Sequence, residues 1–130
     1  MPTRTLISVI DDDESVREAL RDLLDSLGFT VEAFASAVDF LASSNIRDTS
    51  CLIADVQMPR MTGVELHSRL VESGYAIPTI LITAYPYDSV RAQVLAEGVI
   101  CYLSKPLDEA ALVGCVRSVL ERKNPGESDS

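Results

Sequence analysis

Several features of specialised protein classes are scarce or missing in this sequence. The three cysteines, Cys51, Cys101 and Cys115, form no CxxC pair and are odd in number. They therefore predict buried thiols in a reducing compartment and argue against a disulfide or zinc framework. No apolar run approaches the roughly 20 residues of a membrane helix, and no segment resembles a cleavable signal. These absences predict a cytoplasmic protein with no membrane contact.

Positive charge is also scarce. The chain has 11 Lys and Arg residues against 20 Asp and Glu residues, which gives a formal net charge of −9. Because basic side chains supply most contacts to nucleic acid phosphates, this balance argues against direct nucleic acid binding by this chain. With 130 residues, 47% of them hydrophobic, the chain is still long and apolar enough to fold as one domain without a staple.

The predicted domain covers residues 1–121. The remaining residues 122–130, RKNPGESDS, are polar and contain Pro and Gly. This composition fits either a frayed natural end or the stub of a linker to a further domain.

Within the domain, short β-type runs alternate with longer helical patterns. Strands are predicted at Leu6–Ile10, Thr30–Phe34, Cys51–Val56, Thr79–Thr83 and Val99–Leu103. Helical spacing of apolar residues covers 16–27, 36–41, 64–71, 88–97 and 108–120. Three of the strands are apolar almost throughout, which is typical of parallel strands covered on both faces. The order predicts an α/β fold with an open parallel sheet between helices.

Acidic residues follow two of the predicted strands. Asp11 and Asp12 come directly after the first strand, and Asp55 lies at the end of the apolar third strand. Carboxylates near a helix start or a turn have ordinary structural explanations. In a parallel sheet, however, functional groups gather at the carboxyl ends of the strands. Three carboxylates meeting there would form an oxygen-rich site for Mg²⁺ or Mn²⁺.

Two further polar residues end the later strands. Thr83 ends the fourth strand and is followed by the small Ala84, while Lys105 follows the fifth strand. A strand-terminal threonine and a surface lysine are each unremarkable alone. Together with the acidic residues, they favour one chemistry, in which a carboxylate attacks a phosphorus atom and the hydroxyl and ammonium groups hold the phosphoryl oxygens.

Four segments in order along the chain carry a family resemblance: VIDDDESVR, LIADVQMPRMTGVEL, ILITAY and CYLSKP. Together they resemble the receiver domain of two-component response regulators, most closely the receivers that carry LuxR-type DNA-binding outputs. The resemblance covers about residues 5–121. It implies a flavodoxin-like (βα)5 domain with five parallel strands in the order 2-1-3-4-5 and helices on both faces.

The resemblance implies a phosphoacceptor and a metal site. Asp55 matches the aspartate that receives a phosphoryl group from a sensor histidine kinase. Asp12 and Asp11 match the acidic pair that binds Mg²⁺ (or Mn²⁺), Asp12 directly and Asp11 through water. Asp55 itself and the backbone carbonyl of Gln57 match the other protein ligands.

The resemblance also implies a set of switch residues. Thr83 matches the hydroxyl that moves toward the phosphoryl group, and Lys105 matches the lysine that holds it. Tyr102 matches an aromatic residue whose rotamer follows Thr83, although an ordinary strand aromatic would also fit. Pro106 matches a proline that follows a cis peptide bond in the family.

The sequence departs from the family pattern after the fourth strand. Where related receivers have a TAHGD-like stretch, this chain has TAYPYD from Thr83 to Asp88. Tyr85, two residues after Thr83, is predicted to overhang the pocket and hinder the attacking water. Tyr85 and Gln57 are therefore candidate determinants of a long phosphate lifetime.

The expected mechanism is a population switch. Phosphorylated Asp55 gains contacts with Thr83 and Lys105, which shifts the loop after the fourth strand toward an active form. The surface of the fourth helix, fifth strand and fifth helix then binds an output partner or a second copy of the chain. Beyond self-catalysed phosphoryl transfer and slow hydrolysis, no enzymatic activity is expected.

Two alternatives remain at this stage. Asp11-x-Asp13-x-Ser15 faintly resembles the nucleophile motif of haloacid-dehalogenase-type phosphatases, in which Asp11 would be phosphorylated instead of Asp55. The chain could also be a receiver-like interaction module that never takes phosphate. An EF-hand starting at Asp11 is excluded, because Val16 and Asp22 occupy the positions of its glycine and glutamate.

Overall fold

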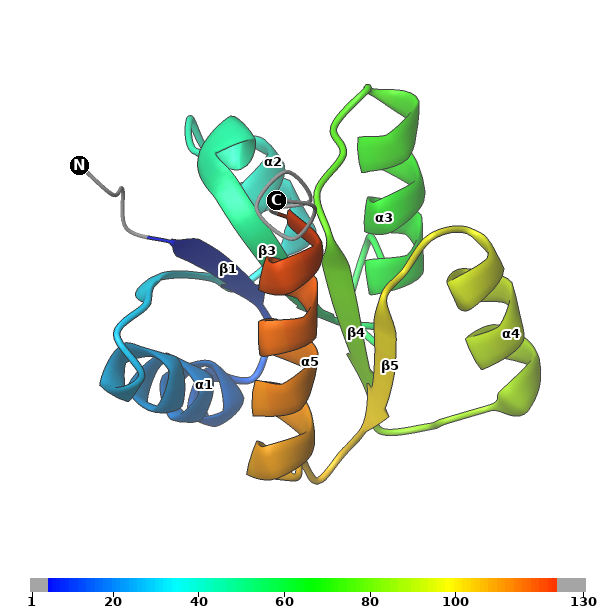
Figure 1. Cartoon of the computed structure of the whole chain (residues 1–130). Coiled ribbons are helices and arrows are strands. Elements are labelled where there is room, and N and C mark those ends of the chain that lie inside the picture. Colours follow the sequence, from blue (N-terminus) through cyan, green and yellow to red (C-terminus); the bar gives the residue numbers. More distant parts are fainter. Residues whose placement is uncertain (1–4, 124–130) are drawn as a thin grey trace.

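The computed structural model describes residues 5–123 as one α/β unit (Figure 1). The strands are β1 (Leu6–Ile10), β2 (Thr30–Phe34), β3 (Thr49–Asp55), β4 (Thr79–Thr83) and β5 (Cys101–Ser104). The helices are α1 (Glu14–Ser26), α2 (Ala37–Leu41), α3 (Gly63–Glu72), α4 (Asp88–Ala96) and α5 (Glu109–Lys123), with a 3-10 turn at Ile46–Asp48. All strand pairs are parallel and the strand order is β2-β1-β3-β4-β5, which confirms the predicted topology.

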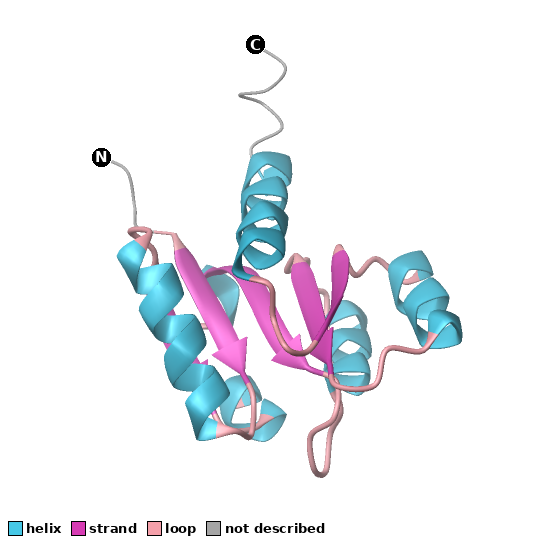
Figure 2. Ribbon diagram, turned by 90° about the horizontal axis from the view of Figure 1, so that it is seen from below, coloured by secondary structure: helices cyan, strands magenta, loops and turns pink. Residues whose placement is uncertain are grey.

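Helices cover both faces of the sheet (Figure 2). On one face, α1 and α5 bury an apolar cluster against alternate strand residues, with Leu24 and Val119 fully enclosed. On the other face, α2, α3 and α4 pack over a second cluster that contains Phe40 and Leu66. This double cover explains why β3 and β4 read as continuous apolar runs.

Four strand limits differ from the prediction: β3 ends one residue before the predicted Val56, β5 ends one residue after the predicted Leu103, and both strands begin elsewhere than predicted. β3 begins at Thr49, two residues before the predicted start, because the buried Thr49 hydroxyl bonds to the Ser8 hydroxyl at 2.8 Å. β5 begins two residues after the predicted Val99, whose N–H donates instead to the Val94 carbonyl in the turn that ends α4. The hydroxyl pair sets the start of β3 and the turn after α4 sets the start of β5, so the apolar pattern alone does not predict where these strands begin.

Other predictions need smaller adjustments. α5 continues to Lys123, two residues into the predicted polar tail, and residues 124–130 of that tail lie outside the described residues. Cys51 is buried as predicted, whereas Cys101 and Cys115 are only half-buried because they face the margin of the α5 cluster. None of the described helices is both long enough and apolar enough to cross a membrane.

The helices near the site are anchored very differently. α3 begins with a reciprocal capping box between Thr62 and Glu65, which satisfies two of its free N–H groups. At the start of α4, Tyr87 supplies no side-chain cap, and Val94 is the one buried residue among the described residues of this helix. α3 is therefore firmly seated, while α4 is held weakly.

Candidate functional site

Three carboxylates meet at the carboxyl edge of the sheet. Asp11 and Asp12 follow β1, and Asp55 ends β3, the neighbouring strand. One carboxylate oxygen from each lies within 4.8 Å of the others. Asp11 and Asp55 are 1% and 3% exposed, whereas Asp12 faces solvent. The structure thus brings together the three acidic residues that the sequence singled out.

Lys105, which follows β5, reaches into this cluster. Its Nζ lies 3.2 Å from Asp11 Oδ2 and 3.4 Å from Asp55 Oδ2. Partial burial alone would lower the pKa of Lys105, but its interactions with the two carboxylates outweigh this effect and raise it. The ammonium group is therefore charged at neutral pH and balances two buried carboxylates.

The ionised form of Asp55 remains unfavourable in the folded protein, although Lys105 lies beside it. Burial and the negative charge of Asp11 raise the pKa of Asp55, while Lys105 and the backbone N–H of Gln57 oppose the shift. A carboxylate in this setting is stabilised by any group that removes negative charge from it or adds a cation beside it.

The donor set fits a small hard cation. Asp11 Oδ2 is buried, and among the described residues its polar partner is Lys105, whose Nζ lies 3.2 Å away. Asp12 adds an exposed carboxylate on the solvent side, where waters could complete an octahedron. The acidic cluster therefore offers oxygen ligands of the type that Mg²⁺ and Mn²⁺ prefer.

A second set of contacts joins the ends of β3 and β4. The Thr83 hydroxyl donates to Gln57 Oε1 at 2.9 Å and accepts from the Tyr85 N–H at 2.9 Å. The Ala84 N–H also donates to Gln57 Oε1, at 3.2 Å, and the Gln57 N–H donates to Asp55 Oδ1 at 3.3 Å. The family resemblance pointed to the Gln57 backbone carbonyl as a ligand and to Gln57 as a candidate determinant of phosphate lifetime, and the side-chain contacts with Thr83 and Ala84 were not predicted.

The two candidate tyrosines lie in contrasting surroundings. Tyr102 on β5 is 6% exposed, and its backbone carbonyl accepts a 3.3 Å hydrogen bond from Arg91 of α4. The Tyr85 side chain is 60% exposed in the loop after β4. The resemblance also implied a cis bond before Pro106, and the Lys105–Pro106 peptide is cis.

The arrangement matches a known family over most of the chain. A scan against family models matches residues 7–117 to the response regulator receiver domain. The chain belongs to the response regulator receiver family. Proteins of this family act in phosphorylation-dependent two-component signalling, and receivers are generally signalling modules that partner with histidine kinases. Receiver domains typically bind Mg²⁺ at an acidic pocket, and the cluster of Asp11, Asp12 and Asp55 is consistent with such a pocket.

Individual relatives support the same assignment. The response regulator protein TodT of Pseudomonas putida is 37% identical over 117 residues, which are 90% of this chain and 52% of TodT. The transcriptional regulatory protein FixJ of Azorhizobium caulinodans is 36% identical over 122 residues, 94% of this chain and 58% of FixJ. The receiver thus spans about half the length of the curated relatives it matches.

Solved structures show the same fold. The response regulator StyR superposes with a TM-score of 0.86 at 37% identity, covering 98% of this chain and 66% of StyR. A receiver protein from Burkholderia phymatum gives a TM-score of 0.76 at 37% identity, with coverage of 91% and 96%. The StyR chain therefore extends beyond the matched region, whereas the Burkholderia phymatum protein is matched over almost its whole length.

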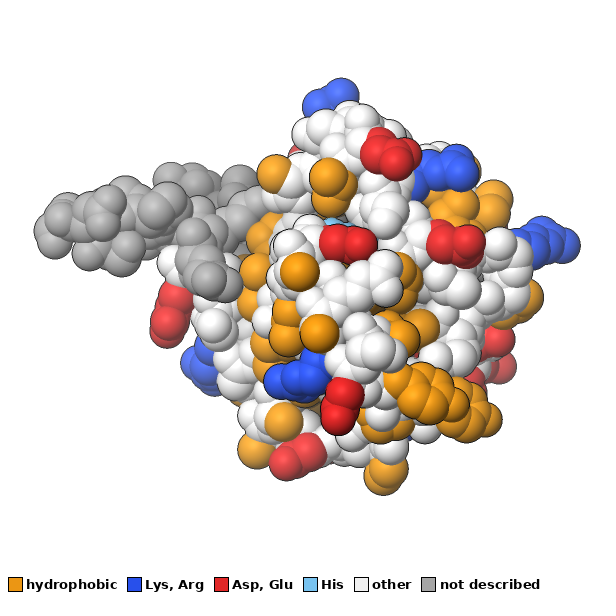
Figure 3. All heavy atoms as spheres, turned by 90° about the vertical axis from the view of Figure 1, so that its right-hand side faces the viewer, with side chains coloured by type: hydrophobic (Ala, Val, Ile, Leu, Met, Phe, Trp, Pro, Cys, Tyr) orange, Lys and Arg blue, Asp and Glu red, His pale blue; other side chains and the backbone are white. Residues whose placement is uncertain are grey.

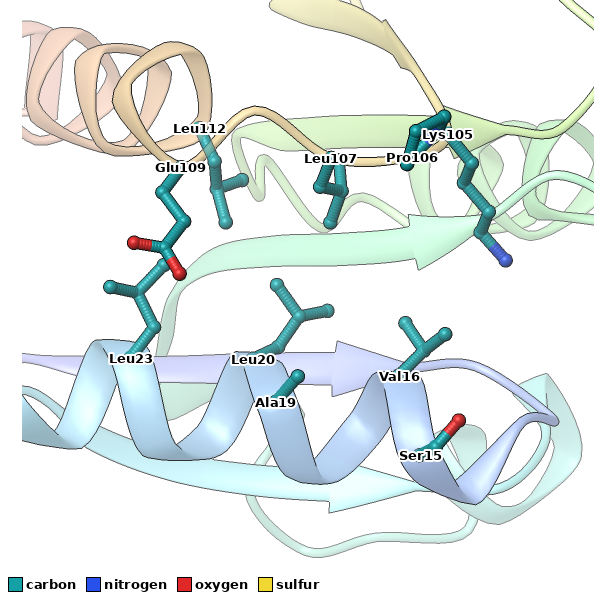
Figure 4. Close-up of a pocket in the computed structure, with 10 residues that line it drawn as sticks. All are labelled: Ser15, Val16, Ala19, Leu20, Leu23, Lys105, Pro106, Leu107, Glu109 and Leu112. Atoms are coloured by element: carbon teal, nitrogen blue, oxygen red, sulfur yellow. The ribbon is translucent and has the colours of Figure 1, made fainter.

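An apolar groove adjoins the acidic pocket of this receiver. It has a volume of about 310 Å³ and lies between α1 and the segment leading into α5 (Figure 4). Apolar side chains such as Leu20, Leu23 and Leu107 point into it, and Lys105 and Pro106 form one end. A molecule bound in the groove would therefore contact Lys105, whose ammonium group forms ion pairs with the buried Asp11 and Asp55.

The opposite side of the receiver carries exposed apolar side chains. Tyr85, Tyr87 and Leu95 are 60%, 62% and 36% exposed, and they lie in or just before α4. Figure 3 shows this side of the molecule, with hydrophobic side chains set among charged ones. Exposed aromatic residues of this kind are common in surfaces that bind other proteins.

Proposed function

We propose that Asp55 is the phosphoacceptor of a signalling switch. The observation that carries the proposal is the place of Asp55, buried at the end of β3 between Asp11, Asp12 and Lys105. A sensor histidine kinase supplies the phosphoryl group as phosphohistidine. One Asp55 carboxylate oxygen attacks the phosphorus, the P–N bond breaks, and the leaving imidazole takes up a proton, so that an acyl phosphate remains.

The other residues around Asp55 have supporting roles. Asp11, Asp12, Asp55 and the Gln57 backbone carbonyl would hold Mg²⁺ or Mn²⁺, which supplies a Lewis acid that offsets charge on the phosphoryl oxygens. Lys105 holds a phosphoryl oxygen with its ammonium group, because it already lies 3.4 Å from Asp55 Oδ2. These contacts orient the incoming group and stabilise the charge that it carries.

Phosphorylation is transmitted to an output by a change in the surface next to Thr83. A phosphoryl group on Asp55 would draw the Thr83 hydroxyl toward it and change the loop that leads into α4, with Tyr102 repacking beside it. The surface of α4, β5 and α5 then binds an output, which is either a further domain, another protein or a second copy of this chain. The exposed Tyr85 and Tyr87 give that surface its apolar contact area.

Intact-mass spectrometry after incubation with acetyl phosphate tests the acceptor. The wild type should gain one phosphoryl group, about 80 Da, only when Mg²⁺ is present. Asp55→Asn should abolish the gain, whereas Asp13→Asn should keep it, because Asp13 caps α1 and asparagine caps equally well.

Each other outcome has a definite meaning. A gain that survives Asp55→Asn but disappears in Asp11→Asn would refute Asp55 as the acceptor and favour the phosphatase-like chemistry at Asp11. No gain from acetyl phosphate or from any histidine kinase would identify the chain as an interaction module that does not take phosphate.

The Tyr85 side chain is expected to slow the loss of phosphate. Tyr85→Ala should shorten the acyl-phosphate lifetime several-fold, because a smaller side chain next to Thr83 would admit the attacking water more easily. The measurement is the decay of the phosphorylated mass after removal of acetyl phosphate. Tyr87→Ala is the matched control, since Tyr87 is equally exposed but lies two residues further along the loop. Equal lifetimes in wild type and Tyr85→Ala would refute the effect.

A further inference from the structure

The Thr83 hydroxyl is fully engaged before any phosphoryl group arrives. Thr83 is fully buried, its hydroxyl hydrogen is directed at Gln57 Oε1, and one of its lone pairs accepts from the Tyr85 N–H. A hydroxyl has only one hydrogen to donate. Thr83 can therefore donate to a phosphoryl oxygen only after its bond to Gln57 is broken.

Gln57 touches both the acceptor and the switch residue. Its backbone N–H donates to Asp55 Oδ1, and its side-chain carbonyl accepts from the Thr83 hydroxyl and from the Ala84 N–H. One half-buried residue thus connects the end of β3 with the loop that leads toward α4. A side chain in this position can set how readily the loop changes.

We propose that Gln57 is a positioning residue that holds the switch in its resting state. Its amide oxygen keeps the Thr83 hydroxyl and the Ala84 N–H in place until phosphoryl oxygens on Asp55 compete for the same hydroxyl hydrogen. This inference rests on the proposed function, because it assumes that Asp55 receives the phosphoryl group. The hydrogen bond to Gln57 then reduces the population of the active form. It therefore lowers the apparent affinity of every ligand that binds preferentially to the active form.

Two substitutions at position 57 distinguish the effect of the side-chain hydrogen bond from the effect of side-chain size. Gln57→Met keeps the length of the side chain but removes the acceptor, so Thr83 and Ala84 both lose their partner. Gln57→Glu keeps an acceptor oxygen at the same place and should restore the resting contacts. The main-chain bond from residue 57 to Asp55 is available in both variants.

Amide hydrogen exchange by NMR, on the full chain without phosphate or Mg²⁺, tests the resting contacts. In Gln57→Met the amides of Ala84 and Tyr85 should exchange about fivefold faster, the factor expected for one neutral hydrogen bond. The amides of Val56 and Lys105 bond to main-chain carbonyls at the same edge of the sheet and should be unchanged. Gln57→Glu should exchange like the wild type.

Binding of beryllium fluoride with Mg²⁺, a phosphoryl mimic on carboxylates, tests the coupling to Asp55. Gln57→Met should bind it about fivefold more tightly, because Thr83 no longer has a bond to give up. In a Thr83→Ala background the same substitution should change the affinity little, since the hydroxyl that Gln57 restrains is gone.

The possible failures are distinguishable. Unchanged exchange at Ala84 and Tyr85, or faster exchange at all four amides, would overturn the positioning role while leaving Asp55 as the acceptor. A tightening that persists in the Thr83→Ala background would overturn it as well. If the wild type takes neither phosphoryl nor beryllium fluoride, the proposed function fails, and the exchange experiment still decides whether Gln57 restrains Thr83.

Discussion

Gly63→Ala is expected to destabilise the domain by about 2–3 kcal/mol, near the upper part of the range for overpacked sites. A Cβ atom at position 63 would lie 2.5 Å from the Asp55 backbone oxygen and 3.1 Å from Leu81 Cδ2. The nearer obstacle is backbone, which cannot rotate away as a side chain can. Either the first turn of α3 or the backbone at Asp55, the last residue of β3, would have to shift to relieve this contact.

Chemical denaturation and phosphoryl uptake measure the two effects of Gly63→Ala. Uptake from acetyl phosphate should slow together with the loss of stability, because the crowded backbone is that of the acceptor Asp55. Gly114→Ala is the matched control, since Gly114 is exposed in α5 with nothing within 4 Å of its added Cβ. That variant should gain about 0.5–1 kcal/mol from helix propensity. Equal stability of Gly63→Ala and wild type would contradict the close approach to Asp55.

Lys105→Met is the second substitution with a large expected effect. It leaves Asp11 and Asp55 buried without their cation, and we expect a loss of about 2–3 kcal/mol at pH 7, below the full range for buried pairs because Lys105 is 23% exposed. The interactions that raise the pKa of Lys105 stabilise the fold at every pH below its ordinary value, so the contribution is complete at pH 7.

The loss of folding stability caused by Lys105→Met should be smaller at acidic pH than at pH 7. The pKa of Asp55 is raised by burial and by Asp11, so its ionised form costs stability, and that cost disappears as the pH falls through the folded-state pKa. Without Lys105 the pKa of Asp55 should rise further, and the protonated carboxyl no longer needs a cation. Thermal unfolding at pH 7 and pH 4.5 measures the difference, and Lys105→Arg, which keeps the charge, serves as control. A deficit that is equal at both pH values would show that lost packing, not lost charge, is responsible.

The placement of the main site residues could be predicted from the sequence. Asp55 and Lys105 both follow apolar runs, and parallel strands bring their carboxyl ends to one edge whatever the details of packing. The limits of β1, β2 and β4 could also be predicted, because polar or turn-forming residues flank them.

Other features depend on geometry that no residue pattern encodes. The family resemblance singled out Gln57, but the contact of its side chain with Thr83 depends on how the chain turns after β3, and no residue pattern predicts that turn. Gly63 marks a loop in the sequence, but its closeness to Asp55 is set by the angle at which α3 leaves the sheet. Val99 is apolar, as a strand residue would be, but in the structure its N–H donates to the Val94 carbonyl in the turn after α4.

The weak anchoring of α4 has an energetic consequence for the route of the signal. One charge-assisted hydrogen bond to a phosphoryl group contributes about 1.5–3 kcal/mol. That is comparable with the burial of one valine, and Val94 is the residue that α4 buries. α5 buries Leu112, Val116 and Val119, which would cost several times as much to withdraw. The energy of one such bond is therefore of the size needed to release α4 and smaller than that needed to release α5, so we expect α4 to respond more readily than α5.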